Sequence, residues 1–322
     1  MIGPRVVERF AAAGFRVRVL ASRPKPELFG PEIDVRIGDV TDPSAARSAV
    51  QNVDAVVHLA ARLHVMDGSS LDLAAYRRAN VDGTRNMIDA AIEADVRRFV
   101  FFSTIAVYGP GRGDLWSESS PIDPDTPYGA TKAEAERLVL AATRRDGAPL
   151  GVVLRLAAVF GPNLKGNYLR LVRALAAGRF VPLGTGANRR ALVNDRDVAA
   201  AALLAATHPA AAARVYNVSD GVEHSLSSVI DAICEALGRR PPRLHVPLAP
   251  VRMAAGIVEA LARLVSVQPP VSRAAIDKYT EDTRVDSGAV GRELGFVPQS
   301  DLREGWKDAI AAMRRSGQLR DA

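Results

Sequence analysis

The stretch Arg98-Phe-Val-Phe-Phe-Ser103 is a short run of apolar, largely aromatic residues, which is the pattern of a buried β-strand. It opens into a loop rich in Gly, Pro, Ser and Asp that reaches Thr126, and a helical pattern then runs from Tyr128 to about Arg145. Thr104 follows the strand directly, and open α/β sheets bind their ligands at the carboxyl ends of their strands. Strand, loop and helix therefore predict one α/β unit with a ligand site near Thr104.

Tyr128 and Lys132 lie one turn apart on the same face of the predicted helix. A nearby ammonium favours the phenolate, so we expect Lys132 to lower the pKa of Tyr128 toward the working pH. With the Thr104 hydroxyl sharing the proton, these side chains are suited to exchange a proton with a sugar or alcohol hydroxyl while a hydride moves elsewhere. The spacing alone is weak evidence, because an ordinary surface helix can carry both residues, and it gains weight from the preceding strand and loop.

The remaining pattern predicts a doubly wound α/β fold. Strands and helices alternate from a helix over Val6–Ala13 and a strand over Phe15–Leu20 to about Gly161, as a parallel sheet with crossover helices requires. After Pro162, short strands, helices and proline-containing loops indicate a smaller lobe over the carboxyl edge of the sheet. At 322 residues the chain is long enough for one elaborated domain or two closely joined ones.

Further segments resemble, in order and spacing, those of the extended short-chain dehydrogenases/reductases, in the branch of nucleotide-sugar epimerases and dehydratases. They cover nearly the whole chain and are Gly38–Asp42, Val56–Ala61, Asn80–Asn86, Arg155–Pro162, Arg190–Val198 and Val215–Gly221. The resemblance implies a Rossmann-like sheet with a C-terminal substrate lobe. It also implies that Thr104, Tyr128 and Lys132 form the catalytic triad.

The same resemblance implies a division into two lobes. The dinucleotide-binding domain would comprise residues 1–162, with 187–219 returning to it, and the substrate-binding lobe would comprise 163–186 and 220–322. The helical stretches 71–94 and 128–145 resemble those that form a four-helix interface in this family, which implies a homodimer.

NAD is the cofactor that the resemblance implies. Its contacts would be made by Gly3, Arg23, Asp39, Val40, Leu59, Ala60, Ala61, Asn80, Tyr128 and Lys132. Asp39 and Val40 would lie beside the adenine, and Asn80 near the active-site end of its strand. The implied substrate is a UDP-linked nucleotide sugar, contacted by Thr104, Asn167 and Arg190. The Arg190 guanidinium would pair with the diphosphate, unless it is simply a solvated arginine beside Arg189.

The start of the chain departs from the family pattern. Met1-Ile2-Gly3 leads at once into the first helix, so that Gly3 matches the last glycine of the phosphate-binding turn while the first strand and two earlier glycines are missing. We therefore expect a Rossmann-like fold without its N-terminal strand. A start codon set too far downstream, which we favour, a shortened chain and a degenerate, inactive protein all explain this. Arg23 stands where NAD-preferring members have an acidic residue, so NADP is a second candidate cofactor unless Arg23 is merely solvated.

The residues after Thr104 narrow the reaction. Dehydratases of this group carry Asp-Glu there to eliminate water, whereas this chain has Ile105-Ala106, which transfers no proton. We expect a 4-epimerase that acts through a transient 4-keto sugar, in surface-polysaccharide synthesis. Ala158 stands where epimerases often have an asparagine, so an NADPH-dependent reductase of UDP-4-keto sugars is the alternative. A non-catalytic binding protein that lost the cofactor turn is the alternative of another class.

Composition argues against several other classes. The net charge of +6 comes from scattered arginines without a recognition module, which speaks against nucleic-acid binding. The apolar stretch Val251–Val267 is too short and too charged to span a bilayer, and no signal peptide is visible, so we expect a cytoplasmic protein without stable membrane insertion. No cluster of ligating side chains indicates a metal, and the single Cys234 is expected in the core.

Overall fold

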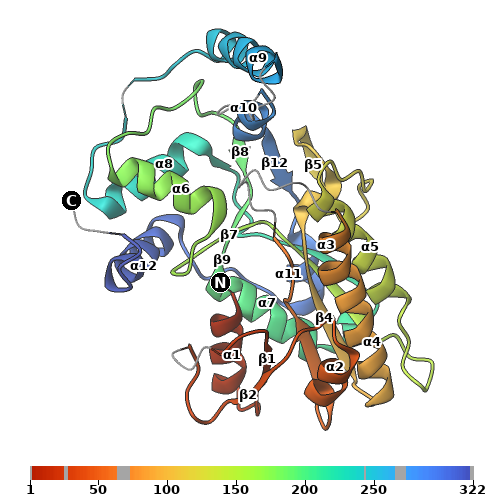
Figure 1. The fold of residues 1–322 in the computed structure, drawn as a ribbon. Helices are drawn as coiled ribbons and strands as arrows, with labels where there is room; N and C mark the ends of the chain where they lie inside the picture. Colours follow the sequence, from red (N-terminus) through yellow and green to blue (C-terminus); the bar gives the residue numbers. More distant parts are fainter. Residues whose placement is uncertain (1, 25–27, 64–72, 243, 265–272, 320–322) are drawn as a thin grey trace.

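The computed structural model describes the whole chain except residues 1, 25–27, 64–72, 243, 265–272 and 320–322. Its centre is a four-stranded sheet in the order β10-β6-β4-β3, in which every neighbouring pair is parallel. The strands are β3 (Ala55–His58), β4 (Arg98–Thr104), β6 (Gly151–Leu156) and β10 (Val215–Val218). The predicted α/β fold with parallel strands is confirmed (Figure 1).

Helices cover both faces of this sheet, which explains why its strands are mostly apolar. Phe99 and Phe101 of β4 face one layer, formed by α2 (Pro43–Val50), α4 (Gly83–Glu93) and α5 (Pro127–Ala141). Val100 and Phe102 face the opposite layer, formed by α1 (Gly3–Ala12), α7 (Asp195–Thr207) and α11 (Gly288–Leu294). The alternation along β4 therefore divides the core into two layers, one on each side of the sheet.

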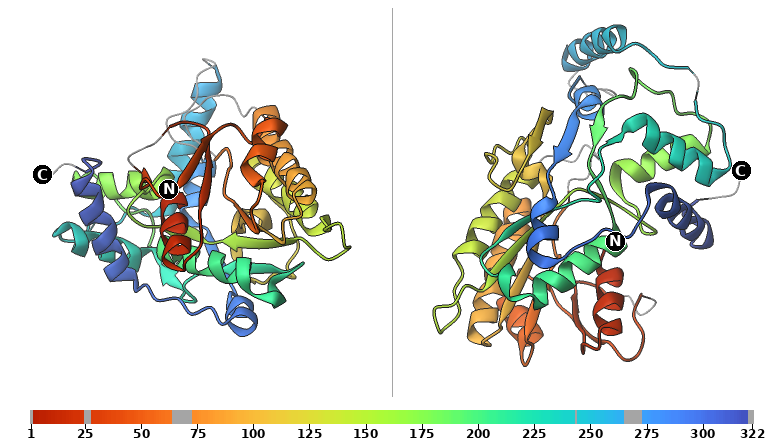
Figure 2. Two further views of the ribbon diagram at one scale, coloured as in Figure 1. Left: turned by 90° about the horizontal axis from the view of Figure 1, so that it is seen from below. Right: turned by 180° about the vertical axis from the view of Figure 1, so that it is seen from behind.

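Two more strands form a separate parallel pair. β1 (Arg18–Ala21) pairs with β2 (Asp34–Ile37), with Arg18 opposite Asp34. Among the described residues, no strand joins β1 to β3, so the parallel sheet is in two pieces. This break falls where the doubly wound order places its first strand. The view from below in Figure 2 shows β1 and β2 beside α1, apart from the other strands.

The smaller lobe has a core of its own. It consists of α6 (Gly166–Ala176), α8 (Leu226–Leu237) and α12 (Leu302–Arg315), which pack around Trp306 and Ile233. Cys234 of α8 is buried there, as predicted. Figure 1 shows these helices on the side of the molecule away from α4 and α5. The short parallel pair β7 (Ala158–Phe160) and β9 (Leu192–Asn194) leads into this lobe.

A second four-stranded sheet connects distant parts of the chain. Its order is β11-β8-β12-β5, with β5 (Arg112–Trp116), β8 (Arg189–Arg190), β11 (His224–Ser225) and β12 (Asp282–Val285). β5 lies within the predicted loop from Thr104 to Thr126. The sequence could not indicate it, because β5 is fixed by pairing with β12, which lies far away in the sequence. α9 (Leu248–Leu264) and α10 (Arg273–Thr280) precede β12.

Several predicted boundaries are wrong by a few residues. The strand predicted from Phe15 begins at Arg18, because Gly14, with a φ of 85°, and Phe15 bond back to the last turn of α1. The helix predicted to Arg145 ends at Ala141, where a turn through Gly147 begins. The predicted helical stretch 71–94 begins outside the described residues. It then comprises α3 (Leu73–Arg77), a π-helical stretch (Arg78–Asp82) and α4.

Candidate active site where β4 meets α5

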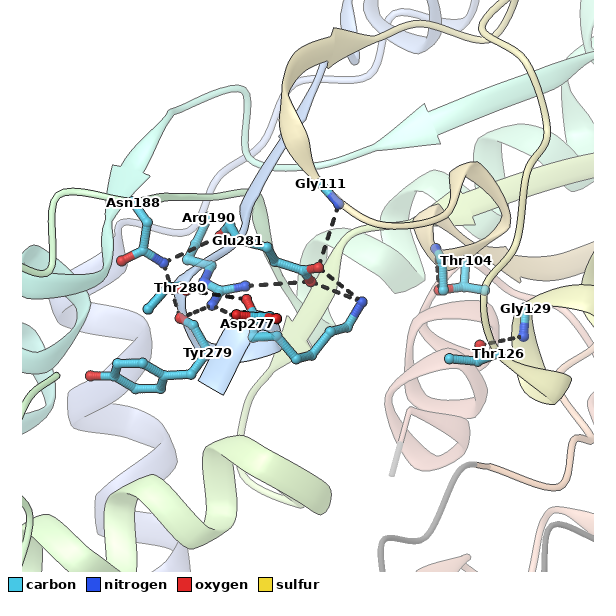
Figure 3. A network of polar contacts seen from close by, with 12 residues as sticks. Thr104, Gly111, Thr126, Gly129, Asn188, Arg190, Asp277, Tyr279, Thr280 and Glu281 are labelled. Carbon is cyan, nitrogen blue, oxygen red and sulfur yellow. Dashed lines mark hydrogen bonds and ion pairs between the residues drawn. The ribbon is translucent and has the colours of Figure 1, made fainter. Parts of the chain in front are cut away.

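Thr104 and the first turn of α5 lie against each other. Thr104 ends β4, and its Oγ1 accepts a hydrogen bond of 3.2 Å from the amide of Ala106. Thr126 caps α5 by accepting a bond of 3.1 Å from the amide of Gly129. A Cβ on Gly129 would stand 2.6 Å from the carbonyl oxygen of Ala106, so only glycine allows this approach. Figure 3 shows Thr104 beside Thr126 and Gly129. Tyr128, the residue before Gly129, is therefore held next to the end of β4.

Lys132 extends from the next turn of α5 onto β4. Its side chain is buried, and its ammonium lies 3.8 Å from the centroid of the Phe101 ring. Loss of water lowers the pKa of Lys132 to about 7, and the carboxylate of Glu136, one turn further along α5, acts in the opposite direction. An ammonium over an aromatic face is attracted to the ring, which partly replaces the lost water.

The expected effect of Lys132 on Tyr128 is wrong for this structure. Burial raises the pKa of Tyr128 to about 12, and no nearby cation lowers it. The reason is that the Lys132 ammonium rests on Phe101 rather than beside the phenol. At neutral pH Tyr128 therefore keeps its proton and is placed to act as a hydrogen-bond donor.

A buried polar network lies beneath these residues, and the sequence reasoning missed it. Glu136 receives hydrogen bonds from Ser103 and, at 2.7 Å, from Nη2 of Arg155. Nη1 of Arg155 donates to the Tyr108 hydroxyl at 2.9 Å, and that hydroxyl donates to Asn217 at 2.7 Å. Glu136 was detectable in principle, because its position four residues after Lys132 puts both side chains on one helix face. The other partners come from separate elements, namely three strands and, for Tyr108, the 3₁₀ turn after β4.

The predicted cofactor residues beyond this corner lie mostly at strand ends. Asp39 and Val40 follow β2, and the Val40 carbonyl accepts a bond of 3.0 Å from Asn86. Leu59, Ala60 and Ala61 directly follow β3. All five residues follow the carboxyl ends of parallel strands, which is where a parallel dinucleotide fold binds its cofactor.

Asn80 is a correction, because it lies in the π-helical stretch before α4 and not in a strand. Its buried amide accepts a bond of 2.7 Å from the amide of Arg62 and donates one of 3.0 Å to Thr131. Asn80 thus connects the segment after β3 to α5. The side chain fixes the backbone beside the predicted cofactor contacts.

Gly3 is the first residue of α1, and Arg23 is exposed after β1. No side chain caps the amide groups at the start of α1, and a Cβ on Gly3 would meet no described atom within 4 Å. Uncapped helix amides next to open space suit a phosphate group. Together with the strand ends, the described residues fit a dinucleotide at its adenine, phosphate and nicotinamide-side positions.

Besides Thr104, the predicted substrate residues are Asn167 of α6 and Arg190 of β8. Asn167 is exposed in the first turn of α6. Arg190 donates to the carbonyl oxygens of Tyr279 and Lys278 at 2.5 and 3.1 Å. Its Nη1 also lies 3.9 Å from the carboxylate of Glu281. The Arg190 guanidinium is thus held at the junction of α10 and β12 and is not a free surface group.

Glu281 was not predicted and joins three elements. Its carboxylate accepts a bond of 3.4 Å from the amide of Gly111 and pairs with Lys278 at 2.9 Å. Figure 3 shows Glu281 between Arg190 and Gly111, and Thr104 across the open side of this group. The substrate lobe therefore meets the segment after Thr104 at a charged cluster, Arg190, Glu281 and Lys278.

The profile of the NAD dependent epimerase/dehydratase family matches residues 1–219. The chain belongs to this family. A UDP-glucose 4-epimerase from Vibrio cholerae is 31% identical over 280 residues, which is 86% of this chain and 81% of that protein. An N-acetyl-alpha-D-glucosaminyl-diphospho-ditrans,octacis-undecaprenol 4-epimerase from Escherichia coli O157:H7 is 30% identical over 310 residues, 94% of this chain and 89% of that protein. MoeE5 in complex with UDP-glucose and NAD has a TM-score of 0.76 at 28% identity, with 98% and 96% of the two chains covered.

The family assignment confirms the resemblance that the sequence carries and makes this chain a NAD-dependent enzyme of nucleotide-sugar chemistry. The roles of its individual residues stay predictions. In the part of the chain that the structure describes, no helix is long and apolar enough to cross a membrane. The described residues also contain no group of three or more His, Cys, Asp or Glu side chains that could hold a metal ion.

Proposed function

We propose that this protein is a NAD-dependent nucleotide-sugar 4-epimerase that acts through a transient 4-keto sugar. The observation that carries the proposal is the close approach of the first turn of α5 to the segment after β4. A Cβ on Gly129, the residue after Tyr128, would stand 2.6 Å from the Ala106 carbonyl oxygen, and Lys132 is buried one turn further along α5. A hydroxyl pair beside a buried ammonium suits proton exchange with a sugar hydroxyl. NAD, when bound, supplies the acceptance and return of the hydride.

Each side chain has a separate task in this proposal. Tyr128 exchanges the proton of the C4 hydroxyl, and Thr104 holds that hydroxyl in place through a hydrogen bond. Lys132 supplies the positive charge that Tyr128 needs when it loses its proton, and its ammonium must leave the Phe101 ring to approach the phenol. With a pKa of about 12, Tyr128 is almost entirely protonated at neutral pH and offers little phenolate, so the proposal includes this approach of the ammonium.

The segment after Thr104 argues against elimination of water. Ile105 is buried, and Ala106 contacts Gly129 through its carbonyl oxygen. Neither side chain transfers a proton, so the acid and base of a dehydratase are lacking at these positions.

The proposed substrate is a UDP-linked hexose or N-acetylhexosamine, with Arg190 at the diphosphate and Asn167 nearby. The partly buried guanidinium of Arg190 supports this role, since its carbonyl contacts hold the planar group in one orientation. The relative that acts on an undecaprenol-linked sugar supports a place in surface-polysaccharide synthesis. We also propose a homodimer through the helical stretches 71–94 and 128–145, as the family resemblance implies.

A reductase of UDP-4-keto sugars is the second candidate, because the exposed Arg23 after β1 offers a partner for the 2′-phosphate of NADPH. The deciding experiment incubates the protein with UDP-glucose or UDP-N-acetylglucosamine and NAD, and separately with a UDP-4-keto sugar and NADPH. We expect equilibration of the C4 epimers with only catalytic amounts of NAD. Stoichiometric oxidation of NADPH, without epimerisation, would replace the epimerase by the reductase.

A further inference from the structure

Glu136 is a buried carboxylate for which the proposed reaction has no task. It lies on α5 one turn after Lys132, and its side chain is 4% exposed. Three hydrogen bonds from Arg155, of 2.7, 3.1 and 3.2 Å, and one from Ser103 satisfy its oxygens. A charged group in such a place costs free energy unless every lone pair has a partner, so its retention calls for a reason.

The partners of Glu136 surround the candidate active site. Ser103 directly precedes Thr104 on β4, Lys132 precedes Glu136 on α5, and Arg155 comes from the neighbouring strand β6. The carboxylate therefore connects the strand that carries Thr104 to the helix that carries Tyr128. Movement of α5 along β4 would break its bonds to both strands.

Glu136 also determines the charge balance around Lys132. Among the described residues, the charged or titratable groups that act on the ammonium, or that it acts on, are Glu136 on α5 and His58 on β3, and Arg155 on β6 pairs with Glu136. Burial and the Lys132 charge lower the pKa of His58 to about 3, and Tyr128 keeps its proton, so both are neutral at pH 7. Glu136 is thus the anion that favours a charged Lys132.

We propose that Glu136 is a positioning residue that keeps Lys132 protonated and fixes the α5 turn of Tyr128 against the end of β4. The proposal rests on the proposed function for its consequence in catalysis, but the charge of Lys132 is measurable without any reaction. Arg155 has a supporting part, because its Nε bonds to Oε1 and its Nη2 to Oε2 of Glu136, and this contact with both oxygens orients the carboxylate.

The first test measures the pKa of Lys132 by NMR in protein labelled with ¹³C at the lysine ε-carbon. The chain has only five lysines, and Lys132→Arg identifies the signal. In Glu136→Gln, which keeps the shape but loses the charge, we expect the pKa of Lys132 to fall by about 1–2 units. Ser103→Ala is the matched control, because it removes one hydrogen bond of the same carboxylate and should leave this pKa nearly unchanged. An unchanged pKa in Glu136→Gln would overturn the proposal.

Glu136→Gln leaves Arg155 buried without its partner and can therefore fail to fold. If it does not fold, the double variant Glu136→Gln/Arg155→Met, which removes both charges, is measured instead. We expect a smaller fall of the Lys132 pKa in the same direction, because the nearer of the two charges is the lost carboxylate. Glu136→Asp, which keeps the charge, should restore the pKa toward that of the parent protein. A Lys132 pKa in the double variant equal to that of the parent counts against the proposal.

The second test is the pH dependence of kcat/KM for epimerisation of the UDP-sugar. Loss of the Lys132 proton should limit activity on the alkaline side, and Glu136→Gln should move this limb to lower pH, whereas a purely structural role would lower activity equally at all pH values. The experiment distinguishes a failure of the proposed epimerase function from a failure of the proposed role of Glu136. A shifted lysine signal without epimerisation contradicts the proposed function alone, and epimerisation with an unshifted signal contradicts the role of Glu136 alone.

Discussion

The corner of β4 and α5 and the pair β1–β2 belong to one parallel fold, yet they differ in how completely they are packed. Phe99, Val100 and Phe101 of β4 are fully buried between two helix layers. The polar groups in the same corner are bonded to one another, from Ser103 through Glu136 to Arg155. The proposed proton transfer thus lies in a part of the molecule whose strand is fully buried and whose polar side chains are hydrogen-bonded.

The outer pair is much more open. Val35 and Ile37 of β2 are 38% and 54% exposed, although both are apolar. Beneath the neighbouring α1, Asp195 is buried with no hydrogen bond to either carboxylate oxygen, and Arg5 stands 3.6 Å away. An apolar strand in water and an unsatisfied buried carboxylate both reduce stability.

The difference in packing coincides with the two proposed tasks of the site, which are proton transfer and binding of the cofactor. The residues for proton transfer are held by contacts within a closed core, whereas the predicted contacts for the adenine and phosphates follow strands and a helix with fewer partners. Local stability follows buried contacts and satisfied bonds, so we expect the outer pair to open before the corner does. The following predictions test this contrast in order of decreasing effect.

The largest effect is expected at Tyr128. Removal of its hydroxyl in Tyr128→Phe should reduce turnover by about 10²–10⁴-fold, because the proton-transfer contribution is lost while the closed corner keeps its packing. Steady-state epimerisation and nucleotide-sugar binding are to be measured together. Tyr216→Phe is the control, since its hydroxyl bonds to Glu293 of α11, away from this corner. Unchanged turnover in Tyr128→Phe would remove Tyr128 from the mechanism.

The next effect concerns the buried ion pair of the corner. Arg155→Met should lower the free energy of unfolding by about 3–5 kcal/mol, because Glu136 would be left charged and unpaired. Urea denaturation measures it. Arg97→Met is the control, because Arg97 pairs with Asp54 at 2.8 Å while both side chains are more than 70% exposed, and the expected loss is below about 1 kcal/mol. An equal loss of unfolding free energy in the two variants would contradict the view that the corner of β4 and α5 is more tightly packed than the surface.

Replacement of Asp195 should stabilise the protein, whereas replacement of Arg155 should destabilise it. Burial raises its pKa from 3.8 to about 6, so its ionisation favours the unfolded chain, and its contribution to stability is lost as pH rises from about 4 through 6. Asp195→Val should therefore be more stable than the parent by about 2–3 kcal/mol at pH 7.5, with an advantage that shrinks below pH 6. Thermal unfolding across this pH range tests it. Asp54→Val, at an exposed site, should show no such pH dependence.

The smallest effect is expected in β2 itself. Val35→Ala should cost less than about 1 kcal/mol, because 38% of this side chain is already in water. The same substitution at Val153 of β6, which is fully buried, should cost about 2 kcal/mol or more, since it leaves a cavity. Urea denaturation of the two variants gives a direct comparison of the two sheets. A cost at Val35 equal to that at Val153 would mean that the outer pair is packed as closely as the centre.

Local patterns predicted the parts that depend on neighbours in sequence. The strand at Arg98, the helix after Thr126 and the buried Cys234 all agree with the structure, because each follows from residue spacing within one element. The boundaries at Arg18 and Ala141 were missed, because a turn at Gly14 delays the first strand and the backbone becomes extended at Ala142. β5 was missed because it needs β12 as a partner.

The candidate site shows the same limit. Tyr128 and Lys132 share a helix face, which spacing alone predicts, but the pKa of Tyr128 is raised rather than lowered, because the Lys132 ammonium lies on a ring from β4. Asn80 was expected in a strand and lies in a π-helical stretch. Arg190 was expected to be available for a diphosphate, and no local pattern indicated its contact with Glu281.

The sequence by itself determined the alternation of strands and helices, the two catalytic segments and the family, because these depend on periodicity and on motifs of a few adjacent residues. Only the tertiary structure decided which charged side chains lie next to which other groups. Glu136 and Arg155 come from different elements, as do Lys132 and Phe101, and so do Arg190 and Glu281. A pKa depends on desolvation and on charges a few ångströms away, and those distances exist only once the chain has folded.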